Sequence, residues 1–244
     1  MPFEFAFLDW LYQFRNPVMN AISIFFDYAG AHGEIWIAFT LLLLLFRRTR
    51  RAGFAMAVAL VLYMAAGHFF LKPLFARPRP CDLNTSITML VARPHGHSFP
   101  SGHTASGVAA AYALWLQNRK LGAPALVLAA FIAFTRLYLY VHFPTDVLGG
   151  AVLGIALGTA ASAIANYMAN CKKKQQKAEN EKRVMLAVLD AGLSVCNVIY
   201  YDHSNELVFN WKDYETKVTE NDFNKFVSSV NRSLLPAGIT FKMK

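Results

Sequence analysis

Three short polar segments carry side chains that suit phosphate chemistry. They read KPLFARPRP over 72–80, FPSGH over 99–103 and TRLYLYVHFPTD over 135–146. Their cationic and imidazole side chains are Lys72, Arg77, Arg79, His103, Arg136 and His142. Arginine and lysine bind phosphate oxygens through charge-assisted hydrogen bonds. A pocket that gathers these groups therefore favours a polyanion, and phosphate is the obvious candidate.

The segment from Pro100 to His103 has the features of a helix start that binds an anion. Ser101 is a good N-cap, and Gly102 allows a close approach of the backbone. His103 then falls in the first helical turn, where free N–H groups and the helix dipole favour an anion. We therefore predict that this turn offers a hydroxyl, amide donors and an imidazole to one phosphate.

The spacing of His142 and Asp146 is typical of an oriented nucleophile. Pro144 suits the first turn of a helix and places Asp146 in that turn, four residues after His142. Asp146 could then accept the Nδ1–H of His142, which leaves Nε2 facing the phosphorus. Arg136, six residues before His142, favours this interpretation over a purely structural histidine.

The elements that must position these residues are membrane helices. Of the 244 residues, 55% are hydrophobic and 16% are charged, whereas about a quarter are charged in soluble proteins. Residues 52–71 and 147–171 carry no formal charge, and apolar runs of about 18 or more residues are typical of membrane-spanning helices. The sequence predicts an all-α integral membrane helix bundle with a small C-terminal α+β soluble tail. The acidic N-terminal segment predicts no cleavable signal peptide.

Basic clusters predict the orientation of the spans. They lie at 47–51, 119–120 and 172–174, and the positive-inside rule assigns all of them to the cytoplasm. An outer loop then covers 73–100, and the predicted spans are 32–46, 52–72, 102–117, 121–141 and 145–169. In this topology the three polar segments converge on the outer surface of the membrane.

The N-terminal segments are less clearly assigned. Residues 16–30 form a short stretch that contains Asp27, so this stretch could span the membrane, re-enter it or lie in the interface. If it spans, the bundle has about six transmembrane helices and both termini are cytoplasmic. Residues 3–14 are predicted to form an interfacial helix. Small residues at every fourth position from Gly150 to Ser162 predict close helix packing in the last span.

The composition changes after residue 171. We predict a transmembrane domain over 1–170, a basic linker over 171–183 and a small cytoplasmic module over 184–244. Within the module, VIYYDHSNELVFNW predicts two strands around a turn, residues 218–235 a helix, and ITFKMK a short final strand. We find no catalytic constellation in it, and its role stays open.

The polar segments resemble the signature of the type-2 phosphatidic acid phosphatase superfamily of membrane lipid phosphatases. That signature consists of Lys-x6-Arg-Pro, Pro-Ser-Gly-His and Ser-Arg-x5-His-x3-Asp. The matching residues are Lys72 with Arg79 and Pro80, then Pro100 to His103, then Thr135 and Arg136 with His142 and Asp146. Thr135 replaces the usual serine and keeps the hydroxyl. The resemblance covers roughly residues 1–170 and leaves out the tail.

The resemblance implies a role for each matched residue. His142 would attack phosphorus to give a phosphohistidine, with Asp146 orienting it. His103 would protonate the leaving oxygen and later activate water. The groups that would hold the phosphate are Lys72, Arg79, Ser101, Gly102 and Arg136. Arg77, with Pro78, is an alternative register of the first motif and is expected to be a rim contact.

No cofactor or metal ion is expected. The cations would take the place of a metal, and the sequence has no carboxylate cluster for Mg²⁺. Cys81, Cys171 and Cys196 lack the spacing of metal ligands, and we predict no structural disulfide among them.

The resemblance implies a membrane lipid phosphate as substrate and the lipid bilayer as partner, with no nucleic acid. Bacterial undecaprenyl-diphosphate phosphatases share the compact architecture, the amphipathic N-terminal segment and the outward-facing site. The implied location is the bacterial inner membrane, with the site facing the periplasm or outside and the C-terminus cytoplasmic.

Several points of function stay open at the level of the sequence. Phosphatidylglycerophosphate and phosphatidic acid are the competing substrates, because the motifs read the phosphate and not the tail. A lipid phosphotransferase would use the same site and pass the phosphoryl group to a lipid or sugar. A membrane scaffold or transporter without enzymatic activity is the competing class of function. The oligomeric state is not predicted.

Overall fold

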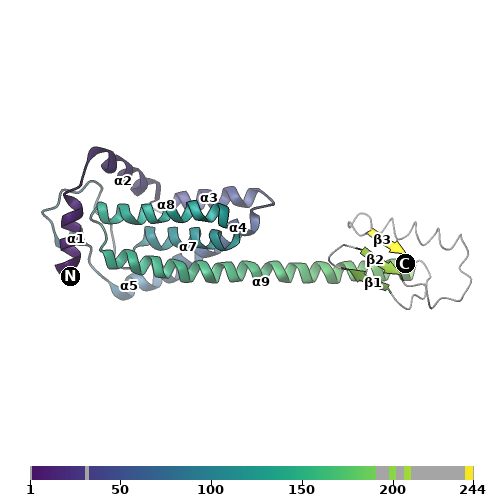
Figure 1. Ribbon diagram of the computed structural model, residues 1–244. Coiled ribbons are helices and arrows are strands. Elements are labelled where there is room, and N and C mark those ends of the chain that lie inside the picture. The colour runs from purple at the N-terminus through teal and green to yellow at the C-terminus, as the bar shows by residue number, and fades with distance from the viewer. Residues whose placement is uncertain (1, 31–32, 191–197, 202–205, 210–239, 244) are drawn as a thin grey trace, which may run out of the picture. The chain divides into compact units, whose positions relative to one another are not determined.

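The computed structural model describes residues 2–30, 33–190, 198–201, 206–209 and 240–243 (Figure 1). The chain divides into two compact units, Met1–Met168 and Ala169–Lys244. The elements that begin in the first unit are α1 (Pro2–Tyr12), α2 (Pro17–Gly30), α3 (Glu34–Leu45), α4 (Arg50–Leu62), η1 (Tyr63–Leu71), α5 (Lys72–Phe75), α6 (Pro80–Leu83), α7 (Gly102–Gln117), α8 (Arg119–Tyr138) and α9 (Pro144–Asp190). η1 is a π-helix, and α4, η1 and α5 follow one another without a break.

Helix α7 is the centre of the first unit. It contacts α3, α4, η1 and α8. Its inner positions are small, and Ala105, Ala109 and Ala110 are fully buried. Small side chains let helices approach closely, which is the usual way to pack helices inside a membrane. Larger side chains such as Trp36 and Met56 fill the space beside α7.

The line of small residues on α9 packs against α7. A Cβ at Gly154 would lie 2.9 Å from the carbonyl oxygen of Ala105, and a Cβ at Gly158 would lie 2.8 Å from that of Ala109. Side chains at these positions would push the two helices apart. The close contact therefore fixes the start of α9 against the start of α7, where two of the polar segments lie.

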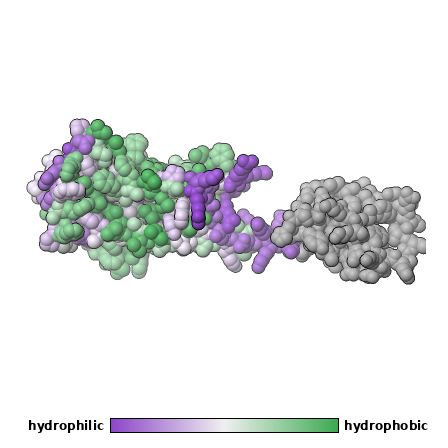
Figure 2. All heavy atoms as spheres, viewed as in Figure 1, coloured by the Kyte–Doolittle hydropathy of each residue, from purple (hydrophilic) through white to green (hydrophobic). Residues whose placement is uncertain are grey.

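The outer surface of the first unit is apolar. Among the described residues, three helical segments are long and apolar enough to cross a membrane: Arg50–Leu83, Arg119–Tyr138 and Pro144–Asn180. Helices α2 and α3 pass the same test only as a bent pair, which raises the number to four at most. Figure 2 shows hydrophobic residues over much of the visible face of this unit. Val61, Val127 and Val152 are among the exposed apolar side chains. This surface is suited to lipid.

The predicted spans agree with these helices to different degrees. Residues 52–72 and 121–141 fall largely within the first two segments, and 145–169 within the third. Helix α7 matches the predicted span 102–117 but has 16 residues, fewer than a typical span. The topology of six spans therefore stays a prediction.

Helix α1 covers the polar end of the first unit. Figure 1 shows α1 at the same end as α5 and the beginning of α9. Leu8 of α1 is buried and packs with Tyr140 and Phe143 of the turn between α8 and α9. Phe3 and Trp10 are exposed on the same helix. One face of α1 therefore packs on the protein and the other carries exposed aromatic side chains. That α1 lies in the membrane interface stays a prediction.

The second unit begins within α9. The predicted basic linker, 171–183, is helical and continues α9. The described strands are β1 (Val198–Tyr201), β2 (Glu206–Phe209) and β3 (Thr240–Met243). β1 pairs antiparallel with β2, and β2 pairs parallel with β3. The predicted helix over 218–235 lies outside the described residues.

Candidate active site

One cavity of about 790 Å³ brings the polar segments together. The predicted site residues on its wall are Lys72, Arg79, Gly102, His103, Arg136 and His142. They come from α5, from the loop after α5, from α7, from α8 and from the turn before α9. The remaining predicted residues, Arg77, Ser101 and Asp146, have partners within the protein that are described below.

His142 is fixed in the turn between α8 and α9. Tyr140 has a positive φ of 65°, which lets the chain reverse before Pro144 begins α9. His142 is 2% exposed, and its Nδ1 lies 3.5 Å from Oδ2 of Asp146. The same carboxylate oxygen accepts the backbone N–H of Phe143 at 2.8 Å. The helix start thus holds Asp146 and His142 in one orientation, as the four-residue spacing predicts.

The protonation of His142 suits a nucleophile. Burial lowers the pKa of His142 from its ordinary 6.5 to about 4, and Arg79 and Lys72 act in the same direction while Asp146 opposes them. Because the pKa lies below the usual value, the imidazole stays neutral as the pH falls from 7 and becomes charged only near pH 4. Neutral Nε2 therefore keeps its lone pair at physiological pH.

Ser98 is a site residue that sequence reasoning missed. Its side chain is fully buried, and its hydroxyl donates to Oδ2 of Asp146. The hydroxyl oxygen of Ser98 also lies 3.3 Å from Nδ1 of His142. These two oxygens are placed to accept a proton from Nδ1, an arrangement that favours the tautomer whose Nε2 lone pair faces the cavity. The sequence held one weak signal, because Ser98 lies just before the Pro-Ser-Gly-His motif.

Arg79 is held beside Nε2 of His142. Its Nη1 lies 3.2 Å from that nitrogen and also donates to the carbonyl of Val141 at 3.1 Å. Its Nε donates to the carbonyl of Gly96 at 3.1 Å. Only 4% of Arg79 is exposed. Loop carbonyls therefore fix the guanidinium at the place where a phosphate oxygen would meet the nucleophile.

Arg136 and His103 form the other side of the cavity. Arg136 is 1% exposed, and its Nη1 lies 2.6 Å from Oδ1 of Asp27 and 3.4 Å from Nε2 of His103. Its Nη2 donates to the hydroxyl of Thr135 at 3.0 Å. Thr135, the departure from the usual serine, thus provides an acceptor for the guanidinium. Asp27 was visible in the sequence only as a carboxylate in an apolar stretch.

The helix start at Ser101 differs from the expectation. Ser101 occupies the N-cap position of α7, but its side chain makes no capping hydrogen bond. Its hydroxyl accepts from Oγ1 of Thr104 at 3.0 Å, and its N–H donates to the carbonyl of Asp146 at 3.0 Å. Ser101 is fully buried. It therefore ties α7 to α9, while the adjacent Gly102 lies on the cavity wall.

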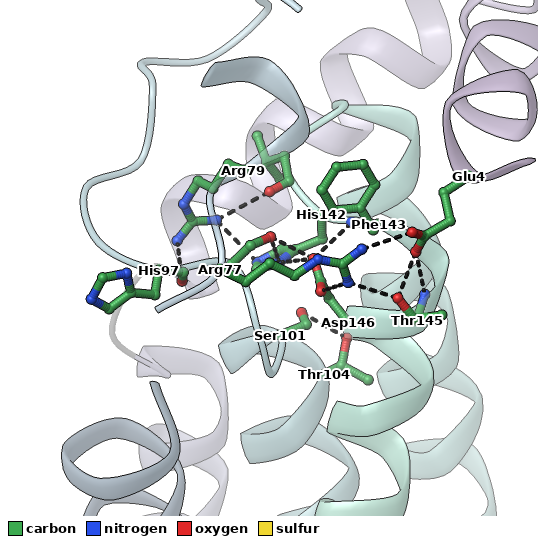
Figure 3. A network of polar contacts seen from close by, with 12 residues as sticks. Glu4, Arg77, Arg79, His97, Ser101, Thr104, His142, Phe143, Thr145 and Asp146 are labelled. Carbon is green, nitrogen blue, oxygen red and sulfur yellow. Dashed lines mark hydrogen bonds and ion pairs between the residues drawn. The ribbon is translucent and has the colours of Figure 1, made fainter. Parts of the chain in front are cut away.

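Arg77 has partners of its own in the protein. Its Nη1 donates to Oδ1 of Asp146 at 2.5 Å and to the hydroxyl of Thr145 at 2.7 Å. Its Nη2 donates to Glu4 of α1 at 2.7 Å. We predicted Arg77 to be a rim contact for substrate; the structure shows it bound to the carboxylate behind His142 (Figure 3).

Potential metal ligands are not clustered at this site. Within the part of the chain that the structure describes, no group of three or more His, Cys, Asp or Glu side chains is arranged to hold a metal ion.

The chain is similar in sequence and in structure to known proteins. The family model described as PAP2 superfamily matches residues 48–169. The chain belongs to the PAP2 superfamily. An undecaprenyl-diphosphatase of Sulfolobus acidocaldarius is 31% identical over 56% of this chain and 66% of its own length. Undecaprenyl-diphosphatase BcrC of Bacillus subtilis is 31% identical over 59% of this chain and 74% of its own. The crystal structure of Aquifex aeolicus LpxE superposes with a TM-score of 0.53 and 28% identity, over 65% of this chain and 94% of that one.

The PAP2 match explains which site residues the sequence could predict. The matched range 48–169 contains all three polar segments. Glu4 and Asp27 lie outside it, yet the structure places both against arginines of the candidate site. In this PAP2 protein, α1 and α2 therefore contribute contacts to the candidate site.

Proposed function

We propose that this PAP2 protein hydrolyses a membrane lipid phosphate or diphosphate without a metal ion, and that its substrate is undecaprenyl diphosphate. The observation that carries the proposal is the orientation of His142. Asp146 and Ser98 hold its Nδ1 side, and Nε2 lies 3.2 Å from Arg79 on the wall of the cavity. A neutral imidazole nitrogen beside a buried guanidinium is suited to attack a phosphorus atom.

The proposed reaction has two steps. Nε2 of His142 forms a bond to phosphorus while the bond from phosphorus to the leaving oxygen breaks, and His103 gives that oxygen a proton. The product is a phosphohistidine and, from a diphosphate, the lipid monophosphate. His103 then takes a proton from water, which attacks the phosphohistidine and releases inorganic phosphate. Lys72, Arg79 and Arg136 would balance the charge on the transferring group, with the Gly102 amide and Ser101 near it.

The size and the lining of the cavity support a lipid substrate. Beyond the polar groups its wall includes the apolar side chains of Ile37, Leu60, Met64 and Val141. A phosphate fills only a small part of 790 Å³, so there is room for part of an apolar chain. Two relatives named undecaprenyl-diphosphatase support a prenyl lipid over a glycerolipid.

The proposed location rests on the charge pattern. Basic clusters at 47–51, 119–120 and 172–174 support a cytoplasmic C-terminus, and they favour a site at the opposite, outer surface of a bacterial inner membrane. This topology does not need α2 as a span, because both ends of α2 lie at the site end of the unit: the N–H of Asn16 donates to Oη of Tyr138 at 2.9 Å, and Asp27 binds Arg136 at 2.6 Å.

A substrate panel tests the proposal. Purified protein in detergent is given undecaprenyl diphosphate, phosphatidylglycerophosphate or phosphatidic acid, each with EDTA, and phosphate release is measured. We expect release in EDTA and the highest kcat/KM for undecaprenyl diphosphate. Loss of all activity in EDTA would refute the metal-free mechanism, and a preference for a glycerolipid would refute the substrate. Radiolabelled substrate with excess lipid acceptor distinguishes transfer, which puts label in a new ester, from hydrolysis, which gives free phosphate.

A further inference from the structure

A chain of alternating charges leads from helix α1 to the dyad of His142 and Asp146 (Figure 3). Glu4 of α1 accepts from Nη2 of Arg77 at 2.7 Å, and Nη1 of Arg77 donates to Asp146 at 2.5 Å. Oε1 of Glu4 also accepts from the hydroxyl of Thr145 at 2.5 Å. The side chains of Glu4 and Arg77 are 12% and 16% exposed, and that of Asp146 is fully buried. These contacts join residues that are 73 and 69 positions apart.

Each oxygen of Asp146 has its own set of partners. Oδ2 accepts from Ser98 and from the N–H of Phe143, and it faces His142 at 3.5 Å. Oδ1 is left for Arg77. The guanidinium of Arg77 also lies 4.2 Å over the ring of Phe143. Arg77 therefore controls the rotation of the carboxylate and, with it, the direction in which the imidazole points.

We propose that Arg77 and Glu4 are positioning residues for the His142 nucleophile, and that helix α1 is thereby part of the active-site framework. The inference rests on the proposed function, in which His142 attacks phosphorus. Glu4 lies outside the family match over 48–169, and Arg77 occupies a variable position of Lys-x6-Arg-Pro. Neither role is therefore implied by the motifs.

The alternating charges make opposite predictions for the two residues. Arg77 is a cation bound to Asp146, so we expect it to oppose protonation of His142, and we expect the anion Glu4 to weaken this effect. The other charged or titratable groups that face His142 are Arg79, Lys72, Asp146 and His103. Substitutions at Arg77 or Glu4 keep the charges of these four groups, but Arg77→Gln also removes the donor to Oδ1 of Asp146. The titration of His142 therefore reports both the two outer charges and the position of the carboxylate.

The titration is measured by NMR on full-length protein in detergent, without substrate, with ¹⁵N-labelled histidine. A His142→Asn variant identifies the His142 signal among the seven histidines. We expect Arg77→Gln to raise the midpoint of His142 by about half a pH unit or more, and Glu4→Gln to lower it by a smaller amount. Asp9→Asn is the matched control, because Asp9 anchors α1 through Oη of Tyr140 at 2.7 Å and does not contact Arg77. It should leave the midpoint within about 0.2 pH unit.

Shifts of the same sign for Arg77→Gln and Glu4→Gln would overturn the proposal, and so would an equal shift for Asp9→Asn. If Arg77→Gln does not fold, Glu4→Gln and Arg77→Lys carry the test. The lysine variant keeps the charge, so we expect its midpoint to match that of the wild-type protein. If the His142 midpoint in Arg77→Lys were raised as much as is expected for Arg77→Gln, an electrostatic role of Arg77 would be contradicted.

Kinetics separate positioning from substrate binding. On undecaprenyl diphosphate we expect Arg77→Gln to lower kcat about tenfold and leave KM unchanged. Arg77→Lys should recover part of kcat, because the ammonium keeps the charge but lacks the planar fork of donors with which Arg77 reaches Asp146 and Glu4. A raised KM with unchanged kcat would instead make Arg77 a substrate contact. If the wild-type protein releases no phosphate but the opposed midpoint shifts are found, the proposed function fails and the positioning network stands.

Discussion

The two histidines of the site are held in different ways. His142 is 2% exposed and lies between Arg79 on one side and Ser98 and Asp146 on the other. His103 lines the cavity from the first turn of α7, and its Nε2 has Arg136 at 3.4 Å. A nucleophile has one task and benefits from one fixed orientation. A general acid that later acts as a base must reach both the leaving oxygen and the incoming water, and the cavity wall provides that access.

The largest expected effect is the loss of the fixed histidine. We expect His142→Ala to lower phosphate release by about a thousandfold or more on every substrate, because the proposed mechanism forms its covalent intermediate on this residue. The measurement is phosphate release in detergent, with circular dichroism to show that the helices are intact. If this folded variant released phosphate at the wild-type rate, His142 would not be the nucleophile.

His103 is expected to matter most when the leaving group needs a proton, because its second role, the activation of water, is the same for every substrate. We expect His103→Ala to lower kcat on a lipid phosphate about a hundredfold, and to have an effect roughly ten times smaller on p-nitrophenyl phosphate, whose leaving group is a stable anion. The His142→Ala variant should not be rescued by this substrate. An equal loss on both substrates would show that His103 is not the general acid.

Ser98 is expected to affect the orientation of His142, because its hydroxyl contacts both Asp146 and His142. We expect Ser98→Ala to lower kcat about tenfold with KM unchanged, because the buried hydroxyl orients Asp146 and His142 and does not line the cavity wall. Ser86→Ala is the matched control, since Ser86 is exposed and bonds only to nearby Asn84. A change in KM instead of kcat would place Ser98 in substrate binding.

The smallest expected effect concerns Thr135, which binds Arg136 next to His103. Thr135→Val removes the hydroxyl that accepts from Arg136, and we expect KM to rise about threefold to tenfold as the guanidinium loses a fixed acceptor. Thr135→Ser keeps the hydroxyl and should restore KM to within about twofold. If the serine variant is as impaired as the valine variant, the threonine methyl and not the hydroxyl is what matters.

The sequence predicted the family, and the comparisons confirm it. It also predicted that Lys72, Arg79, His103, Arg136 and His142 share one site, and the structure brings all of them to one cavity. The motifs made this possible because each places a cation or imidazole at the end of an apolar helix. The uncharged runs 52–71 and 147–171 likewise predicted helices that are long and apolar enough to cross a membrane.

Other parts of the site could not be predicted from the sequence. Asp27 contacts Arg136 across 109 positions, and Glu4 contacts Arg77 across 73. Such contacts depend on how α1 and α2 pack on the other helices, which a local pattern does not encode. The same holds for the hydroxyl of Ser101: its residue type predicts a cap, but tertiary packing gives it Thr104 as a partner. The π-helix before Lys72 also has no simple sequence signal.

A covalent bond between phosphorus and His142 is the central claim of the proposed mechanism. Wild-type protein is mixed with substrate labelled with ³²P at the transferred phosphate, quenched in alkali within the first turnover, and digested for mass spectrometry. We expect label that is stable to base and labile to acid, on the peptide that contains His142, and none in His142→Ala. Phosphate release without labelled His142, or label on another residue, would contradict the mechanism.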